Sequence, residues 1–287
     1  MIAFILLSLS ILLSTGRNLL SKNLSSVSFG TKDFFLRQAF LFLCGTAALA
    51  ILGGTSIGMP SAETVIYAVI YAALLVFAQW FYTAALDGGN TALCSTVYSM
   101  GFILPTLSGS VFFGEQFSLP DVFGFLCASL AVIISGYSRQ DKRTQEGRYF
   151  LPLLIAMLAS GGLGIMQKVQ QRSDSADEKT VFLIIAFILA ALISLAAYFA
   201  AGKRAPEKPD RKTFLFSAGI GAAFGSCNLL NTALAGLLPS AIFFPSLNIG
   251  VILMTMLCGI ILFKERPGKR ELLVLGFGAL AILLLNI

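Results

Sequence analysis

Ten apolar runs of about membrane-spanning length follow one another along this chain, with only short polar gaps between them. A transmembrane helix needs about 20 apolar residues to cross about 30 Å of hydrocarbon. Because lipid offers no hydrogen-bond partners, each run has to satisfy its backbone polar groups internally, and a helix is the expected element. The predicted spans are residues 2–21, 34–53, 63–86, 91–114, 119–137, 149–170, 180–201, 212–235, 240–263 and 269–286.

The composition also indicates an integral membrane protein. Of the 287 residues, 57% are hydrophobic and 12% are charged, whereas a soluble domain carries about 25% charged residues. Histidine is absent and the five cysteines lie in apolar runs without CxxC spacing, so no metal site, disulfide framework or cofactor is expected. The net charge of +6 comes from basic residues in short loops. It is expected to orient the protein in lipid and not to bind nucleic acid. The N-terminus lacks a basic n-region and an A-x-A site, so a cleaved signal peptide is not expected.

A duplicated stretch near the end of each half indicates an internal repeat. Residues 91–115 (TALCSTVYSMGFILPTLSGSVFFGE) and 241–265 (AIFFPSLNIGVILMTMLCGIILFKE) match at a constant spacing of 150 residues. Three identical residues coincide in this register: Gly109 with Gly259, Phe113 with Phe263, and Glu115 with Glu265. The polar linker at 138–148 then separates a first repeat, 1–137, from a second repeat, 149–287.

The number of spans in each repeat predicts how the repeats are related. Five is odd, so the second copy is expected to lie upside down in the membrane. Many secondary transporters follow this plan, with the substrate bound near the midplane between the two halves. The predicted fold is therefore an all-α membrane protein with ten transmembrane helices arranged as two inverted five-helix repeats.

Several motifs resemble those of a known transporter family. The stretches LSGSVFFGE and LCGIILFKE each precede a short turn and a glycine-containing last span, Lys22 and Lys168 lie near the ends of the first and sixth spans, and FFLRQAF starts the second. Together these features resemble the EamA-type members of the drug/metabolite transporter superfamily. The resemblance implies a carrier, not an enzyme, that moves a small organic metabolite, amino acid-like or similar, by alternating access. The chain departs from the family by having Thr15 where a tryptophan is usual, and by lacking a basic loop between the second and third spans.

Uncharged polar residues inside the spans are the candidate substrate-binding residues. Counted from the span midpoints, they form two clusters about one turn to either side of the midplane. An amide that faces lipid would be unsatisfied. These side chains are therefore expected either to line the cavity or to form interhelical hydrogen bonds that hold the bundle. The first cluster contains Gln79, Tyr82 and Tyr98, and the second contains Asn228, Asn231 and Asn248.

Four charged residues near span ends each have two interpretations. Lys22 and Lys168 could extend to the membrane surface, or they could edge the cavity and attract an anionic or carboxylate-bearing substrate. Glu115 and Glu265 could end the fourth and ninth spans and bond the N-terminal amides of the next span, or they could act as gates at the two mouths of the cavity.

Two prolines complete the candidate gating set. Pro105 and Pro245 fall inside the fourth and ninth spans, where proline frees a carbonyl and favours a kink. The kinks are either static or mark these two helices as moving gates. The first span has no Asp or Glu, so proton coupling through a carboxylate there is not expected.

Loop charge predicts the orientation of the chain. When loops are assigned alternately to two sides, nearly all the basic residues fall on one side, and positive charge in short loops faces the cytoplasm. Both termini are therefore expected outside the cytoplasm, in the plasma (inner) membrane, whereas the family resemblance implies that both lie inside.

Two other functions remain open. A lipid-linked carrier or flippase of the same superfamily would show a lateral opening between helices. A non-transporting membrane subunit would need a partner-facing polar surface. An intramembrane enzyme is not expected, because the chain has no histidine, no embedded Asp pair and no Gly-x-Ser-x-Gly. The expected partners are a small-molecule substrate and the lipid bilayer, with the protein as a monomer or a weak homodimer.

Overall fold

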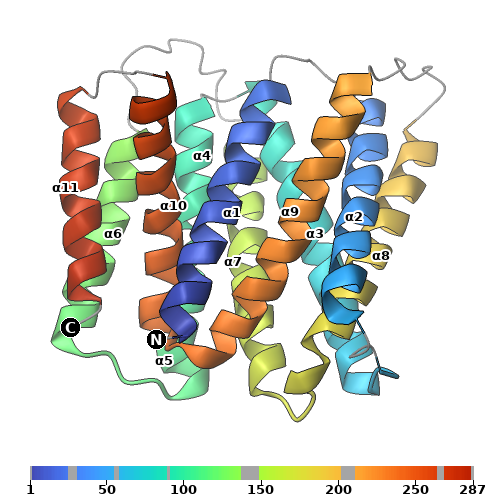
Figure 1. Cartoon of the computed structure of the whole chain (residues 1–287), viewed down its shortest axis with the longest axis horizontal. Coiled ribbons are helices and arrows are strands. Elements are labelled where there is room, and N and C mark those ends of the chain that lie inside the picture. Colours follow the sequence, from blue (N-terminus) through green and yellow to red (C-terminus); the bar gives the residue numbers. More distant parts are fainter. Residues whose placement is uncertain are drawn as a thin grey trace. The chain divides into compact units, whose positions relative to one another are not determined.

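The computed structural model of the chain describes residues 2–24, 31–54, 58–88, 91–136, 149–201, 211–263 and 268–285, and the regular secondary structure of these residues is helical (Figure 1). Each predicted span coincides with a helix to within a few residues, and the fourth span is made of α4, η2 and α5 in succession. The elements are α1 (Ile2–Leu24), α2 (Thr31–Gly53), α3 (Ala62–Gly88), α4 (Thr91–Ser99), η2 (Met100–Phe102), α5 (Ile103–Phe113), α6 (Leu119–Gly136), α7 (Phe150–Arg172), η3 (Ala176–Glu178), α8 (Lys179–Ala200), α9 (Arg211–Leu237), α10 (Ser240–Phe263) and α11 (Lys269–Leu284).

Most of these helices have the length and composition of membrane spans. Eight helical segments in the described part of the chain are long and apolar enough to cross a bilayer, and two shorter apolar helices cover Leu119–Ile134 and Leu272–Leu284. A chain of this kind satisfies its backbone within each helix and exposes apolar side chains to lipid. The structure therefore supports a multi-pass α-helical membrane protein.

The fourth predicted span is not a single α-helix. A 3₁₀ segment, Met100–Phe102, separates α4 from α5 shortly before Pro105. Pro105 has no N–H to donate to the carbonyl of Gly101, four residues earlier, and a 3₁₀ stretch inside a helix often marks a hinge. Pro245, in contrast, lies inside a continuous α10. The structure thus has an interruption at the first proline and an unbroken helix at the second.

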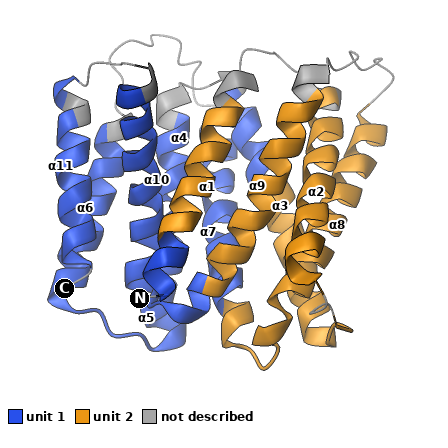
Figure 2. Cartoon of the chain, in the orientation of Figure 1, with its two compact units in different colours: residues 1–7, 77–168, 234–287 blue, residues 8–76, 169–233 orange. Residues whose placement is uncertain are grey.

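The helices form two compact units (Figure 2). Unit 1 comprises residues 1–7, 77–168 and 234–287, and unit 2 comprises residues 8–76 and 169–233. Each unit combines segments from both predicted repeats. In unit 1, α10 packs against α5, α6 and α11, and α6 packs against α11; in unit 2, α2 packs against α8. The described chain ends both belong to unit 1 and lie at the same end of it (Figure 1).

Glycines allow helix backbones to approach closely within each unit. In unit 2, a Cβ added at Gly225 of α9 would lie 2.5 Å from the carbonyl oxygen of Gly45 in α2. In unit 1, a Cβ added at Gly161 of α7 would lie 2.7 Å from the carbonyl oxygen of Gly101 in η2. Small residues permit such contacts between membrane helices, so a larger side chain at either position would force two helices apart.

Candidate functional site

A buried ion pair joins several helix ends of unit 1. Lys168 of α7 is 0% exposed, and its Nζ lies 2.6 Å from Oε1 of Glu115, just beyond α5. The same ammonium donates to the carbonyl oxygen of Leu238 at 3.0 Å, at the C-terminal end of α9. The other carboxylate oxygen of Glu115, Oε2, accepts the backbone N–H of Ser240 at 2.7 Å, at the start of α10. The pair therefore ties the α9–α10 turn to α7 and to the end of α5.

The backbone after α5 directs the Glu115 carboxylate toward this turn. The helix ends at Gly114, whose φ of 65° lies in the left-handed region that favours glycine. The N–H of Glu115 then donates to the carbonyl oxygen of Gly109 at 2.9 Å. A Cβ added at Gly109 would lie 2.5 Å from Oε2 of Glu115 and 2.6 Å from Cβ of Ser240. Gly109 thus leaves the space that the carboxylate and the first residue of α10 occupy.

The charges of the pair match the dipoles of the helix ends that they contact. A cation is stabilised at a helix C-terminus and an anion at a helix N-terminus, and Lys168 and Glu115 occupy these two positions at α9 and α10. Burial alone would raise the pKa of Glu115, but the hydrogen bonds from Lys168 and Ser240 and the charge of Lys168 lower it, and the resulting pKa lies below its ordinary value. At neutral pH the carboxylate is therefore ionised and serves as an ion-pair partner.

Two sequence-based interpretations are changed by this geometry. The prediction that Glu115 bonds the N-terminal amides of the next helix is wrong, because its carboxylate bonds α10 while α6 is capped locally. There the N–H of Ser118 donates to Oδ2 of Asp121 at 2.8 Å, and the N–H of Asp121 donates to Oγ of Ser118 at 3.2 Å. Extension of Lys168 to the membrane surface is also excluded, because its ammonium is buried and bound to Glu115. The repeat counterparts of the pair lie outside the residues whose side chains are described: Lys22 and Glu265.

In unit 2, the two predicted asparagines of α9 bond to other helices. Tyr71 of α3, which is fully buried, donates its hydroxyl to Oδ1 of Asn228 at 2.5 Å. Nδ2 of Asn228 donates to the carbonyl oxygen of Phe224 at 2.8 Å. Ser10 of α1 donates its hydroxyl to Oδ1 of Asn231 at 2.5 Å. These are interhelical hydrogen bonds of the kind predicted as the alternative to lining a cavity.

In unit 1, the two predicted tyrosines lie together. The rings of Tyr82 in α3 and Tyr98 in α4 have centroids 4.5 Å apart and planes inclined at 42°. Gln79 is half-buried about one turn before Tyr82, and Asn248 donates Nδ2 to the carbonyl oxygen of Phe244 in its own helix at 3.0 Å. The six predicted polar residues are thus divided, with four in unit 1 and the two α9 asparagines in unit 2.

A further polar cluster, which the sequence analysis did not single out, lies in unit 2 before α3. Ser61 donates its backbone N–H to Oε2 of Glu178 at 2.9 Å, and its hydroxyl lies 2.9 Å from that of Ser175. Ser175 donates in turn to Oε2 of Glu63 at 3.0 Å. The local part of this cluster has a sequence signal, because the N–H of Thr64 bonds Oγ of Ser61 at 3.2 Å in an N-cap arrangement. The bonds to the segment between α7 and α8 have no such signal.

Comparison with known proteins identifies a shared fold. No family model matches the chain, and no curated protein matches it. A solved structure described only as "Crystal structure of protein" is similar over 99% of this chain and 98% of that chain, with a TM-score of 0.77 and 15% sequence identity. At this identity the likeness concerns the fold alone.

Proposed function

We propose that this protein is a ten-helix membrane carrier that moves a small organic metabolite by alternating access, of the type represented by EamA-like members of the drug/metabolite transporter superfamily. The observation that carries the proposal is the packing of helices with the same position in the two sequence repeats. The second helices, α2 and α8, pack together, as do the fifth helices, α6 and α11, and the fourth, α5 and α10. A two-fold relation between inverted repeats would place such counterparts side by side, as in many secondary transporters.

Two further observations support an inverted arrangement of ten spans. The eight long apolar helices and the two shorter ones together make ten apolar elements. The described chain ends lie at the same end of unit 1, as an even number of crossings requires. We extend this to an orientation in the plasma (inner) membrane with both termini outside the cytoplasm, following the loop charge. A C-terminal reporter that is active only in the cytoplasm should therefore stay silent.

In this proposal the ion pair is one gate of the carrier. The Lys168 ammonium is bound by Glu115 and by the Leu238 carbonyl, so an anionic solute would have to replace the Glu115 carboxylate to reach it. The 3₁₀ segment before Pro105 offers a hinge in the helix that ends beside Glu115. Pro245 frees a carbonyl in α10, the helix of the second repeat that corresponds to this span, although it does not occupy the position that matches Pro105. The proposed substrate contacts remain those predicted from the sequence: Lys22 and Lys168 at the edge of the cavity, and Gln79, Tyr82, Tyr98, Asn228, Asn231 and Asn248.

Solute uptake into proteoliposomes, measured with a mixed metabolite pool, tests the carrier function directly. Purified protein should accumulate or exchange at least one metabolite above the level of protein-free vesicles. Wild-type protein that is folded and inserted but moves nothing in either direction would contradict the proposal and favour a non-transporting subunit.

Substitutions in α9 separate a substrate contact from a structural hydrogen bond. Both Tyr71→Phe and Asn228→Leu break the Tyr71–Asn228 hydrogen bond, but only Asn228→Leu removes the amide. Transport should be lost in Asn228→Leu and kept in Tyr71→Phe at equal membrane levels. Ser226→Leu is the matched control, because the Ser226 hydroxyl bonds the Ala222 carbonyl of its own helix at 2.9 Å. Equal loss in both Tyr71→Phe and Asn228→Leu would assign Asn228 to packing.

A further inference from the structure

Arg17 of α1 is a cation inside a candidate membrane span. The span ends at Ser21, so Arg17 lies about 6 Å within it at a rise of about 1.5 Å per residue. Its guanidinium carbon lies 4.9 Å from the centroid of the Phe224 ring of α9, which is a cation–π arrangement. Within the described residues it forms no ion pair with a carboxylate. An ionisable residue inside a membrane span marks a functional-site hypothesis.

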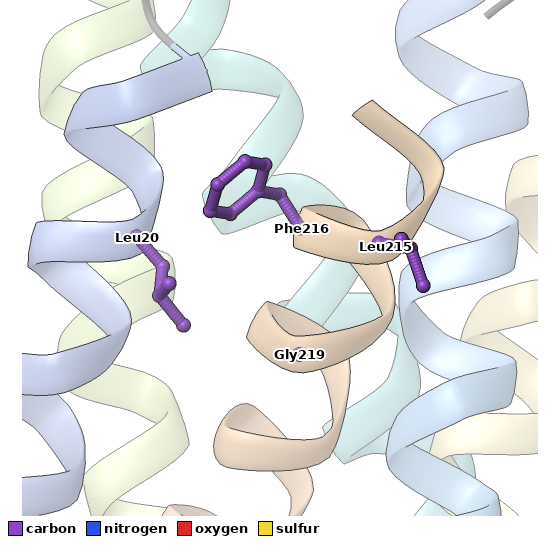
Figure 3. A pocket seen from close by; sticks show the side chains of 4 residues that line it. All are labelled: Leu20, Leu215, Phe216 and Gly219. Carbon is purple, nitrogen blue, oxygen red and sulfur yellow. The ribbon is translucent and has the colours of Figure 1, made fainter. Parts of the chain in front are cut away.

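An apolar pocket of about 250 Å³ lies nearby between α1 and α9, within unit 2. In Figure 3, Leu20 of α1 and Phe216 of α9 extend toward one another's helix, and Gly219 leaves part of the α9 face without a side chain. The pocket is lined by Leu20, Leu215, Phe216 and Gly219.

One buried cluster connects this pocket to Arg17. The cluster is centred on Leu41 and Ile220, and three partly buried side chains pack against it: Leu20, Phe216 and Phe224. Leu20 and Phe216 line the pocket, and the Arg17 guanidinium lies over the ring of Phe224. The pocket lining and the ring under the guanidinium therefore belong to one packed cluster between α1 and α9.

A hydroxyl group lies on the same side of α1 as Arg17. Ser14 precedes Arg17 by three residues, a spacing that places two side chains on one helix face. Its described hydrogen bond is a 3.5 Å contact to Sγ of Cys227, and thioether or thiol sulfur is a weak acceptor. A carboxylate bound to Arg17 would be a stronger acceptor for this hydroxyl.

We infer that Arg17 and this pocket together form a binding site for a small organic monocarboxylate with an aryl or short alkyl group. The planar guanidinium suits a carboxylate, which it can bind through two parallel hydrogen bonds. At a liquid volume of about 30 Å³ per water-sized group, the pocket holds roughly eight non-hydrogen atoms, about the size of an aryl group with a short chain. The inference names a substrate class for the proposed carrier and rests on that function for its role in transport, although binding itself does not.

Equilibrium binding of 3-phenylpropionate to the purified full-length protein in detergent tests the site. The apolar part of this acid has the size of the pocket, and 3-phenylpropanamide is a neutral analogue of nearly the same shape. The acid should bind, and the amide should bind about tenfold more weakly or worse, because only the acid forms a charge-assisted pair. Arg17→Gln should weaken acid binding by about tenfold or more and Arg17→Lys should do so less, since lysine keeps the charge but not the fork geometry.

A glycine pair provides a matched test of the pocket. A Cβ added at Gly219 would meet Leu20 Cδ1 at 3.7 Å, which is ordinary contact, whereas one added at Gly276 of α11 would meet nothing within 4 Å. Both glycines lie at exposed helix positions. Gly219→Leu should fill the pocket and lower acid affinity by about tenfold or more, and Gly276→Leu should leave it unchanged.

Several results would overturn the inference. They are the absence of acid binding to wild-type protein, equal binding of acid and amide, and unchanged acid binding in Gly219→Leu. A phospholipid that mass spectrometry finds on wild-type protein but not on Gly219→Leu, and that the acid does not displace, would assign the pocket to lipid instead. If the Arg17 variants do not fold, the comparison of acid with amide on wild-type protein decides alone. Binding of the acid with no solute uptake would contradict the carrier proposal but not the binding site. Uptake of another solute with no binding of the acid would contradict the binding site but not the carrier proposal.

Discussion

The energetic coupling between Glu115 and Lys168 can be derived from their burial. Lys168 is 0% exposed and Glu115 is 9% exposed, so Glu115→Gln leaves a buried ammonium without its charge partner. Removal of one member of a buried pair costs about 3–5 kcal/mol of unfolding free energy. Lys168→Met should lower the unfolding free energy less than Glu115→Gln does. In Lys168→Met the Glu115 carboxylate still accepts the Ser240 backbone N–H and is in contact with solvent. The double variant Glu115→Gln/Lys168→Met should cost far less than the sum of the two single changes, because neither charge is then left unpaired.

Equilibrium unfolding in mixed detergent micelles, followed by helical circular dichroism, measures all four proteins. Gln and Met keep the approximate size of the original side chains, so the cycle reports charge and hydrogen bonding more than volume. Single-variant costs that simply add in the double variant would refute the coupling. A Lys168→Met protein less stable than Glu115→Gln would refute the claim that the lysine is the more costly charge to leave alone.

Three other predictions follow from particular contacts. The pKa of the Glu115 carboxyl is lower in the folded protein than its ordinary value of 4.5. Its contribution to stability is therefore present above pH 4.5 and is lost as the pH falls through the lower folded pKa. Thermal unfolding on acidification should show this loss in wild-type protein and not in Glu115→Gln. Gly225→Ala should cost about 1–3 kcal/mol by pressing on the Gly45 carbonyl, whereas Gly16→Ala, with nothing within 4 Å, should be neutral or stabilising in the same unfolding assay. Tyr71→Phe should cost about 1–3 kcal/mol in unfolding free energy by removing the hydroxyl that donates to the buried Asn228 amide oxygen, and an unchanged midpoint would contradict that.

The helices are largely predictable from the sequence, because lipid constrains each apolar run by itself. The run at 240–263 becomes α10, Ser240–Phe263, since a segment in hydrocarbon must close its own hydrogen bonds. The 3₁₀ segment at Met100–Phe102 is less predictable. Pro105 signals a disturbance in the fourth span, but the sequence does not state whether the helix kinks or changes type. Pro245, in a similar apolar run, leaves its helix continuous.

The local sequence does not predict which distant residue a polar side chain will bond. The spacing of Glu115 before the next span indicated a local cap, but the cap of α6 is made by Ser118 and Asp121. The carboxylate bonds Ser240 instead, a residue 125 positions further along the chain. Such a bond depends on which helices are neighbours, and that depends on packing of whole helices. The predicted repeats make α2 the counterpart of α8 and α6 the counterpart of α11, and the helices of each pair pack together.

The ion pair also sets an energetic condition on the proposed transport cycle. If solute access at this end requires Lys168 and Glu115 to separate, the open form is disfavoured by about 3–5 kcal/mol relative to the closed one, which corresponds to a population below about 1%. Substrate binding can raise that population only by as much as it favours the open form. A neutral solute would have to supply this free energy through other contacts, whereas an anionic solute could replace the Glu115 carboxylate at the Lys168 ammonium, so that the buried ammonium keeps a charge partner while the displaced carboxylate keeps the Ser240 N–H. The buried pair therefore favours an anion as the solute that opens this end, which is the same class of ligand that Arg17 favours in unit 2.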